Sequence, residues 1–250
     1  MPFPTFPPSA QNKSAHYPET DIHASVYIYL RTALEDHFRD SPDVYISGSR
    51  LLYYEQDNPS ASVAPDLFVI RGVVQDKRCA YEGKAPDVII EITARSTWLE
   101  DVGRKRAIYA ELGVAEYFIY DPLCEYLKPP LQGYHLANCD YAPIVADAQG
   151  RFHSEVLDLD LQIVNGELRL LDPHTGKFLL TPLEAQEAAR QAQSAMLQTE
   201  DLYRQVQELA HKVREELRAE AVARQAADQR AAQAEAEVER LRAELKSRGK

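Results

Sequence analysis

The chain has 250 residues, of which 45% are hydrophobic, enough to bury one full core with an appendage. Its formal net charge of −11 counts against a protein that coats nucleic acid through charge alone. No apolar run approaches membrane-spanning length, and the start of the chain lacks the regions of a signal peptide. The three cysteines form no CxxC pair, so we expect a reducing, cytoplasmic setting.

The first part of the chain predicts an arm, a helix and a hairpin. Residues 1–18 contain several prolines and no periodicity, which predicts a flexible N-terminal arm. Apolar spacing over residues 20–38 predicts an amphipathic helix. His23 falls in its first turn, where we expect it to be solvated or to cap the helix. Residues 43–54 predict a hairpin centred on Gly48.

Two buried strands follow, and each carries an acidic residue. The first has Asp66 at its mouth, and the second, residues 86–93, has Glu91 within an apolar run. Because residues two apart share a face of a strand, Asp87, Glu91 and Thr93 lie on one face. A carboxylate in such a run is costly to bury unless it is paired or binds a metal.

A helix is predicted over residues 97–112, followed by a third strand over residues 116–120. Lys105 falls inside the apolar stripe of this helix, so it should lean towards the sheet. Two acids on neighbouring strands with an inward lysine predict a site for a divalent cation such as Mg²⁺. Each residue alone also has an ordinary structural interpretation, such as a turn for Pro-Asp or a lysine that snorkels to the rim.

The order of these residues resembles the Uma-type putative restriction endonuclease family of the PD-(D/E)XK nuclease superfamily. The resemblance covers roughly residues 23–161. It is carried by Pro65-Asp66, Glu91-Ile92-Thr93, Ser96-Thr97, Asp101, Lys105, Tyr109, Gly113-Val114, Glu116-Tyr117-Phe118 and Asp121-Pro122. It implies an α/β fold with a restriction-endonuclease-like core, a mixed β-sheet flanked by helices.

The resemblance also implies roles for individual residues. In the superfamily two acids bind Mg²⁺, and a lysine two residues after the second acid assists. Carried over, Asp66 and Glu91 are the metal ligands and act in catalysis with Lys105. Thr93 stands where that lysine is expected, which implies that its role has moved to Lys105 on the following helix. The residues that would accompany them are Asp87, Thr93, Ser96, Asp101 and Tyr109.

The implied function is a Mg²⁺-dependent DNA endonuclease, with Mn²⁺ as an alternative cofactor. Because the chain is acidic, we expect its DNA binding to be weak and sensitive to salt. The alternative is a non-catalytic interaction protein that keeps the nuclease fold as a scaffold and dimerises through its tail. Metal affinity separates the two, because a scaffold has no reason to bind Mg²⁺ or Mn²⁺.

After residue 122 the chain consists of short apolar segments between turns, which predict a β-meander beside the core. The pair Asn165-Gly166 is a strong hairpin signal within it. From Pro182 onward the composition of Ala, Glu, Gln, Arg and Leu predicts a long helix or coiled coil. The expected organisation is therefore an arm (1–18), a nuclease-like domain (19–181) and a helical tail (182–250).

The tail carries apolar residues at alternating three- and four-residue spacings. They fall in two registers, one from Leu202 to Val213 and one from Ala227 to Leu245, offset near Leu217. This pattern favours a homodimer paired through residues 200–248. A single solvated helix and a helix folded back on its own domain remain alternatives.

Overall fold

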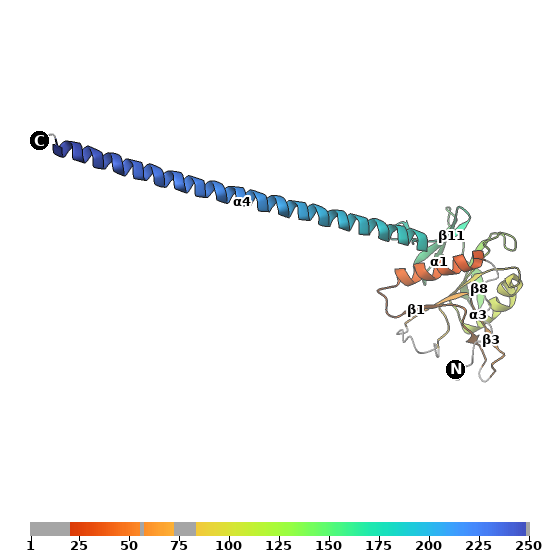
Figure 1. Ribbon diagram of the computed structural model, residues 1–250. Helices are drawn as coiled ribbons and strands as arrows, with labels where there is room; N and C mark the ends of the chain where they lie inside the picture. Colours follow the sequence, from red (N-terminus) through yellow and green to blue (C-terminus); the bar gives the residue numbers. More distant parts are fainter. Residues whose placement is uncertain (1–20, 56–57, 73–83, 249–250) are drawn as a thin grey trace. The chain divides into compact units, whose positions relative to one another are not determined.

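The computed structural model describes residues 21–55, 58–72 and 84–248, with side chains as far as Glu244 (Figure 1). A six-stranded mixed sheet forms the core of its first unit, which ends at Ala185. In spatial order its strands are β1 (Val44–Ser47), β4 (Leu67–Arg71), β5 (Val88–Ile92), β6 (Glu116–Tyr120), β7 (Leu131–Ala137) and β8 (Asp140–Pro143). Strands β5 and β6 are parallel, and the other neighbours are antiparallel. The predicted α/β class with a mixed sheet is confirmed.

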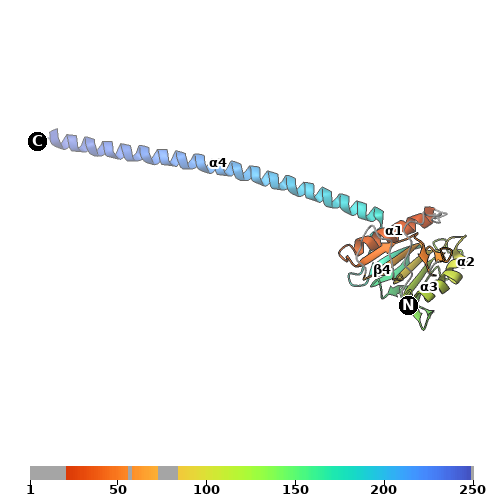
Figure 2. The same cartoon turned by 90° about the horizontal axis from the view of Figure 1, so that it is seen from below.

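Helices cover both faces of this sheet. Helix α1 (Asp21–His37) buries Leu30 and Leu34 against one face. The other face is covered by α2 (Trp98–Glu100), the π-helical turn η1 (Asp101–Lys105) and α3 (Arg106–Leu112). In Figure 2, α1 and the segment from α2 to α3 lie on either side of strand β4. Alternate residues of each central strand therefore pack into one of two separate apolar cores.

The predicted meander divides between two sheets. Its first strands, β7 and β8, extend the central sheet. The remainder forms a four-stranded antiparallel sheet of β9 (Phe152–Ser154), β10 (Leu159–Val164), β11 (Glu167–Asp172) and β12 (Lys177–Phe178). Asn165-Gly166 turns β10 into β11 as predicted, with both residues at positive φ. Glu116 joins the two sheets, because its buried carboxylate accepts hydrogen bonds from the Ser154 hydroxyl and the Glu155 amide.

The hairpin predicted over residues 43–54 is wrong. Strand β1 pairs with β4, and β2 (Leu52–Tyr53) pairs with β3 (Ser62–Val63) in a small separate sheet. Gly48 serves a different purpose, because a Cβ there would lie 2.0 Å from the carbonyl oxygen of Asp66. The turn therefore needs glycine for a close approach of two backbone segments. The predicted arm, residues 1–18, lies outside the described residues.

One continuous helix, α4 (Pro182–Arg248), ends the described chain, as predicted. The structure divides into two units at residues 185 and 186, and each is described here by itself. The helix side chains beyond that point are almost all exposed, including Leu202 and Leu209. None of the helices in the described ranges combines the length and apolar character that crossing a bilayer requires. Pairing of α4 into a coiled coil stays a prediction.

Candidate active site

Asp66 and Glu91 meet at one edge of the central sheet. The antiparallel register pairs Leu67 with Ile90, which brings the start of β4 beside the carboxyl end of β5. The Asp66 amide donates to Glu91 Oε2 at 3.1 Å. In return, the Ile92 amide donates to Asp66 Oδ2 at 2.8 Å. These two backbone hydrogen bonds fix the carboxylates next to each other.

Lys105 reaches this pair from the helical layer. Its Nζ lies 3.1 Å from Glu91 Oε1 and 2.8 Å from Asp101 Oδ1. Asp101 and Lys105 are the two buried residues of the π-helical turn. A π-helix has more residues per turn than an α-helix, and residues four apart lie on the same face in both. The turn thus directs both charged side chains towards the sheet.

Two further side chains complete the contacts of the carboxylates. The Tyr109 hydroxyl donates to Glu91 Oε1 at 2.6 Å. His23 Nε2 lies 3.3 Å from Asp66 Oδ2, and the histidine is 7% exposed. The expectation that His23 is solvated or caps the helix is therefore corrected. Helix α1 lies on the sheet face opposite α3, so the site collects side chains from both layers at their common edge.

Burial and charge set the protonation of the cluster. Burial raises the pKa of Glu91 well above its usual range, against the effect of Lys105. Burial acts in the same direction on Asp66, but the hydrogen bond and charge of His23 outweigh it and hold the Asp66 pKa below its usual value. Although burial opposes it, the charges of Glu91 and Asp101 raise the pKa of Lys105. Lys105 therefore remains an ammonium ion at neutral pH.

The other residues implied by the resemblance occupy different places. Thr93 is buried and donates its hydroxyl to the Tyr120 carbonyl at 3.1 Å, a structural hydrogen bond. Ser96 lies exposed in the turn that follows β5. Asp87 precedes β5 and so lies at the opposite edge of the sheet from Glu91. It accepts from the Arg71 amide at 2.7 Å and pairs with Lys84 at 2.9 Å.

The donor set fits a hard divalent cation. Carboxylate oxygens are the ligands that Mg²⁺ prefers, and one or two carboxylates suffice when water and phosphate supply the rest. Three buried or half-buried carboxyl groups, Asp66, Glu91 and Asp101, share the single ammonium of Lys105. Asp101 is fully buried, and the Lys105 ammonium lies 2.8 Å from its Oδ1. Within the described ranges, no group of three His, Cys, Asp or Glu lies in an arrangement that could hold a metal ion.

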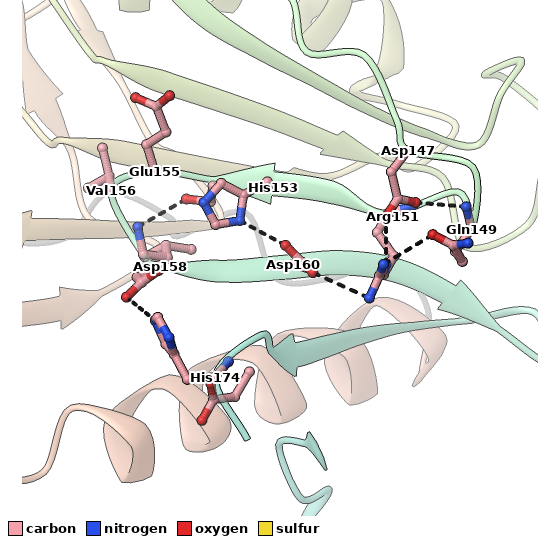
Figure 3. Close-up of polar contacts among 12 residues, drawn as sticks. Asp147, Gln149, Arg151, His153, Glu155, Val156, Asp158, Asp160 and His174 are labelled. Atoms are coloured by element: carbon pink, nitrogen blue, oxygen red, sulfur yellow. Dashed lines mark hydrogen bonds and ion pairs between the residues drawn. The ribbon is translucent and has the colours of Figure 1, made fainter. Parts of the chain in front are cut away.

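A second polar cluster lies in the four-stranded sheet (Figure 3). His153 Nδ1 is 2.8 Å from Asp160 Oδ1, and His174 Nε2 is 2.7 Å from Asp158 Oδ2. Arg151 pairs with Asp147 at 2.7 Å. Most of these side chains are exposed and join residues close in sequence or on adjacent strands. Their contacts account for the turns of the sheet, and we assign them no chemistry.

Comparison with known proteins identifies a family for most of the chain. The model of the family described as "Uma2: Putative restriction endonuclease" matches residues 15–174. A crystal structure described as a putative nuclease belonging to DUF820, from Anabaena variabilis ATCC 29413, is also similar. It has 11% sequence identity and a TM-score of 0.41, and the match covers 55% of this chain and 74% of that one. No curated protein matches the chain.

Proposed function

Because this chain belongs to the Uma2 family, described as putative restriction endonucleases, we propose that it is a metal-dependent DNA endonuclease that hydrolyses phosphodiester bonds. The observation that supports this most directly is the cluster of Asp66, Glu91 and Lys105. These residues come from the start of β4, from β5 and from the helical layer, yet Glu91 accepts a hydrogen bond from the Asp66 amide and pairs with Lys105. Such convergence of acids and a lysine is costly to fold and is typical of a functional site.

Asp66 and Glu91 would hold the metal, Mg²⁺ or Mn²⁺, through their carboxylate oxygens. The chemistry that such an ion supplies when bound is polarisation of the phosphate and activation of water at neutral pH. His23 orients Asp66 through its Nε2 contact, and Tyr109 orients Glu91 through its hydroxyl. These neighbours keep both carboxylates facing the same edge of the sheet.

Lys105 would stabilise the negative charge that develops on the phosphate during hydrolysis. Its raised pKa supports this role and argues against a role as general base, because a protonated amine cannot accept a proton. The π-helical turn supplies a physical account of the displaced lysine. Directly after β5, Thr93 donates its hydroxyl to the Tyr120 carbonyl and does not supply a cation. Lys105 instead brings its ammonium to Glu91 from the helical layer.

The scaffold alternative rests on three observations: Thr93 at the expected lysine position, the acidic character of a chain with a net charge of −11, and the long helical tail. It predicts that divalent cations leave the folded protein unaffected. A ligand that binds only the folded state at one hundred times its dissociation constant stabilises it by about 2.7 kcal/mol. Mg²⁺ should therefore raise the thermal unfolding midpoint of the wild type but not of Asp66→Ala. Equal shifts in both proteins would remove Asp66 from the ligand set.

The deciding experiment measures cleavage of supercoiled plasmid and of branched or single-stranded DNA with Mg²⁺ or Mn²⁺. Wild type should cut in the presence of metal. Glu91→Gln should not, because glutamine keeps the shape of the side chain but lacks the negative charge that would bind the metal. Lys105→Ala should lower the rate by about 10²- to 10³-fold, as expected when one electrostatic stabiliser is removed. Asp158→Asn, in the four-stranded sheet, is the matched control and should cut like wild type. Absence of both cleavage and metal binding in the wild type would favour the scaffold.

A further inference from the structure

Two aromatic rings form a stacked pair on the surface of the nuclease-like unit. The rings of Trp98 and Tyr126 are nearly parallel, with an interplanar angle of 16° and centroids 5.8 Å apart. Both side chains are only partly buried. Leu99 follows Trp98 directly and is 64% exposed. Leu123 lies on the same loop as Tyr126 and is 43% exposed. We call Trp98 and Tyr126 together the aromatic platform.

The loop that carries Tyr126 is held by one buried carboxylate. Asp121 is fully buried, and its Oδ2 accepts from the amides of Tyr126 at 2.6 Å and Leu127 at 2.9 Å. Its Oδ1 accepts from the Leu123 amide at 3.0 Å. A carboxylate that receives several backbone N–H groups fixes a loop firmly. The Tyr126 ring is therefore held on an ordered loop.

The platform lies at the catalytic edge of the sheet. The turn of residues 94–97 leads directly from β5, which carries Glu91, into Trp98. The same short helical segment then supplies Asp101 and Lys105. Asp121 follows β6, which is parallel to β5, so the carboxyl ends of both strands meet at this edge. Both halves of the platform thus come from segments that leave the sheet beside the candidate active site.

The surroundings of the platform offer stacking surface rather than a strong positive field. Arg95 is exposed in the turn that leads to Trp98, and Lys128 is exposed on the loop that carries Tyr126. The acidic side chains of Glu100 and Glu125 are exposed beside them and offset their charge. Tracking a duplex requires many phosphate contacts with Lys or Arg. Aromatic faces instead bind bases that are unpaired, because every base has a π-face to stack once it leaves the duplex.

We propose that Trp98 and Tyr126 bind an unpaired base of single-stranded DNA next to the scissile phosphodiester, with Arg95 beside the backbone. This inference rests on the proposed function and names its substrate class: single strands, or the frayed and branched parts of duplexes. The parallel rings supply the stacking surface, and the neighbouring cluster of Asp66, Glu91 and Lys105 supplies the chemistry. A fully paired duplex keeps its bases stacked internally and gains nothing from the platform.

Trp98 is the only tryptophan in the chain, which gives the test a direct reporter. The full chain is titrated with oligodeoxythymidylate in a chelator, so that binding is measured without metal or cleavage. Stacking of a base on the platform should quench Trp98 emission. A duplex of the same length and a fully abasic strand should not quench it, because neither presents a free base. Equal quenching by the abasic strand would overturn the proposal, since it would report phosphate binding alone.

Variants of Tyr126 test the second ring, with binding followed by anisotropy of a labelled oligonucleotide. Tyr126→Ala should weaken binding of the single strand about tenfold, the loss expected for one stacking contact. Tyr126→Phe keeps the ring and should bind like wild type, because stacking needs the ring and not its hydroxyl. Tyr203→Ala removes an exposed aromatic ring of α4 and is the matched control. Wild-type binding by a folded Tyr126→Ala would overturn the proposal.

Two further outcomes separate this inference from the proposed function. If wild type and Tyr126→Ala cut duplex and single strands in the same ratio, the nuclease stands and the platform has no role in substrate choice. If Trp98 emission changes with protein concentration alone and not with DNA, a second copy of the chain covers the platform and the proposal fails. Selective quenching by single strands in a chain that cuts nothing would support the binding site while removing the proposed catalysis.

Discussion

At the scale of single residues, the candidate site contains charged side chains whose burial destabilises the fold. Glu91 is fully buried in a run of valine and isoleucine, where an unpaired carboxylate would cost several kcal/mol. Lys105, Tyr109 and the Asp66 amide recover part of that cost through direct contacts. A well-packed apolar residue would stabilise the fold at least as well. The retention of a buried charge therefore points to chemistry rather than stability.

Removal of the ammonium tests this view of the cluster. Lys105→Met keeps most of the side-chain volume but leaves Glu91 and Asp101 without their cation. Breaking a buried pair from one side typically costs about 3–5 kcal/mol, and we expect a loss in that range in urea unfolding. Lys84→Met is the control, because the Lys84–Asp87 pair is half-exposed and worth less than about 1 kcal/mol. Comparable losses in both variants would contradict the assigned importance of Lys105.

Gly48 supplies a second test at this scale. A Cβ added there would clash with the Asp66 carbonyl oxygen and lie 2.8 Å from the ring of Tyr27. Gly48→Ala should therefore displace Asp66, destabilise the protein by about 3 kcal/mol as in an overpacked core, and abolish cleavage. Gly103→Ala is the matched control, because among the described residues no atom outside the adjoining backbone of its own helix lies within 4 Å of the added Cβ. That change within a helix should be neutral or stabilising by up to about 1 kcal/mol.

At the scale of elements, period-two and helical patterns predicted most of what places the site. The parity of β5 put Glu91 and Thr93 on one face, and the apolar stripe of residues 98–112 put Lys105 on the sheet side. The π-helical turn was missed, because a 3.6-residue pattern with one extra residue still resembles an amphipathic helix. His23 was also missed, since its contact with Asp66 spans 43 positions of sequence and leaves no local signal.

The start of α4 shows an element whose boundary the sequence does encode. Thr181 and Glu184 form a capping box: the Glu184 amide donates to Thr181 Oγ1 at 3.2 Å, and the Thr181 amide donates to Glu184 Oε2 at 2.7 Å. Arg169 of β11 adds a contact to the same carboxylate at 2.8 Å. The change in composition at Pro182 predicted this boundary, and the residues Thr-Pro-Leu-Glu supply its cap. The box fixes the first turn of the helix to the four-stranded sheet.

The capping box carries a prediction of pH dependence. The hydrogen bond from the Thr181 amide lowers the pKa of Glu184, so the folded state releases this proton more readily than the unfolded chain. The contribution of Glu184 to the unfolding free energy is fully present above the unfolded pKa of about 4.3. It is lost as the pH falls through the folded pKa. Glu184→Ala should lower the unfolding free energy by about 1 kcal/mol at pH 7 and have little effect near pH 2. Glu187 is an exposed glutamate of the same helix, and Glu187→Ala should leave the unfolding free energy unchanged at both pH values.

At the scale of the whole molecule, the described chain leaves the apolar stripe of α4 exposed. The helix has 67 residues, which corresponds to a length of about 100 Å. Leu202, Val206 and Leu209 are each more than half exposed along one stripe. The second register, after the offset near Leu217, begins with three alanines, Ala227, Ala231 and Ala234, so its seam should be thinner there. A solvated single helix gains nothing from such spacing, whereas a second copy in parallel would bury both stripes.

We therefore expect the full chain to be a dimer by sedimentation or light scattering. Leu209→Glu combined with Val213→Glu places charges in the seam and should shift the protein to monomer at the same concentration. Val222→Glu is the matched control, because Val222 is 67% exposed and lies outside both registers. A monomeric wild type, or an unchanged mass in the double variant, would contradict pairing through residues 200–248. If the dimer forms, each particle carries two candidate sites, and loss of double-strand but not single-strand cutting in the monomeric variant would show that both are used.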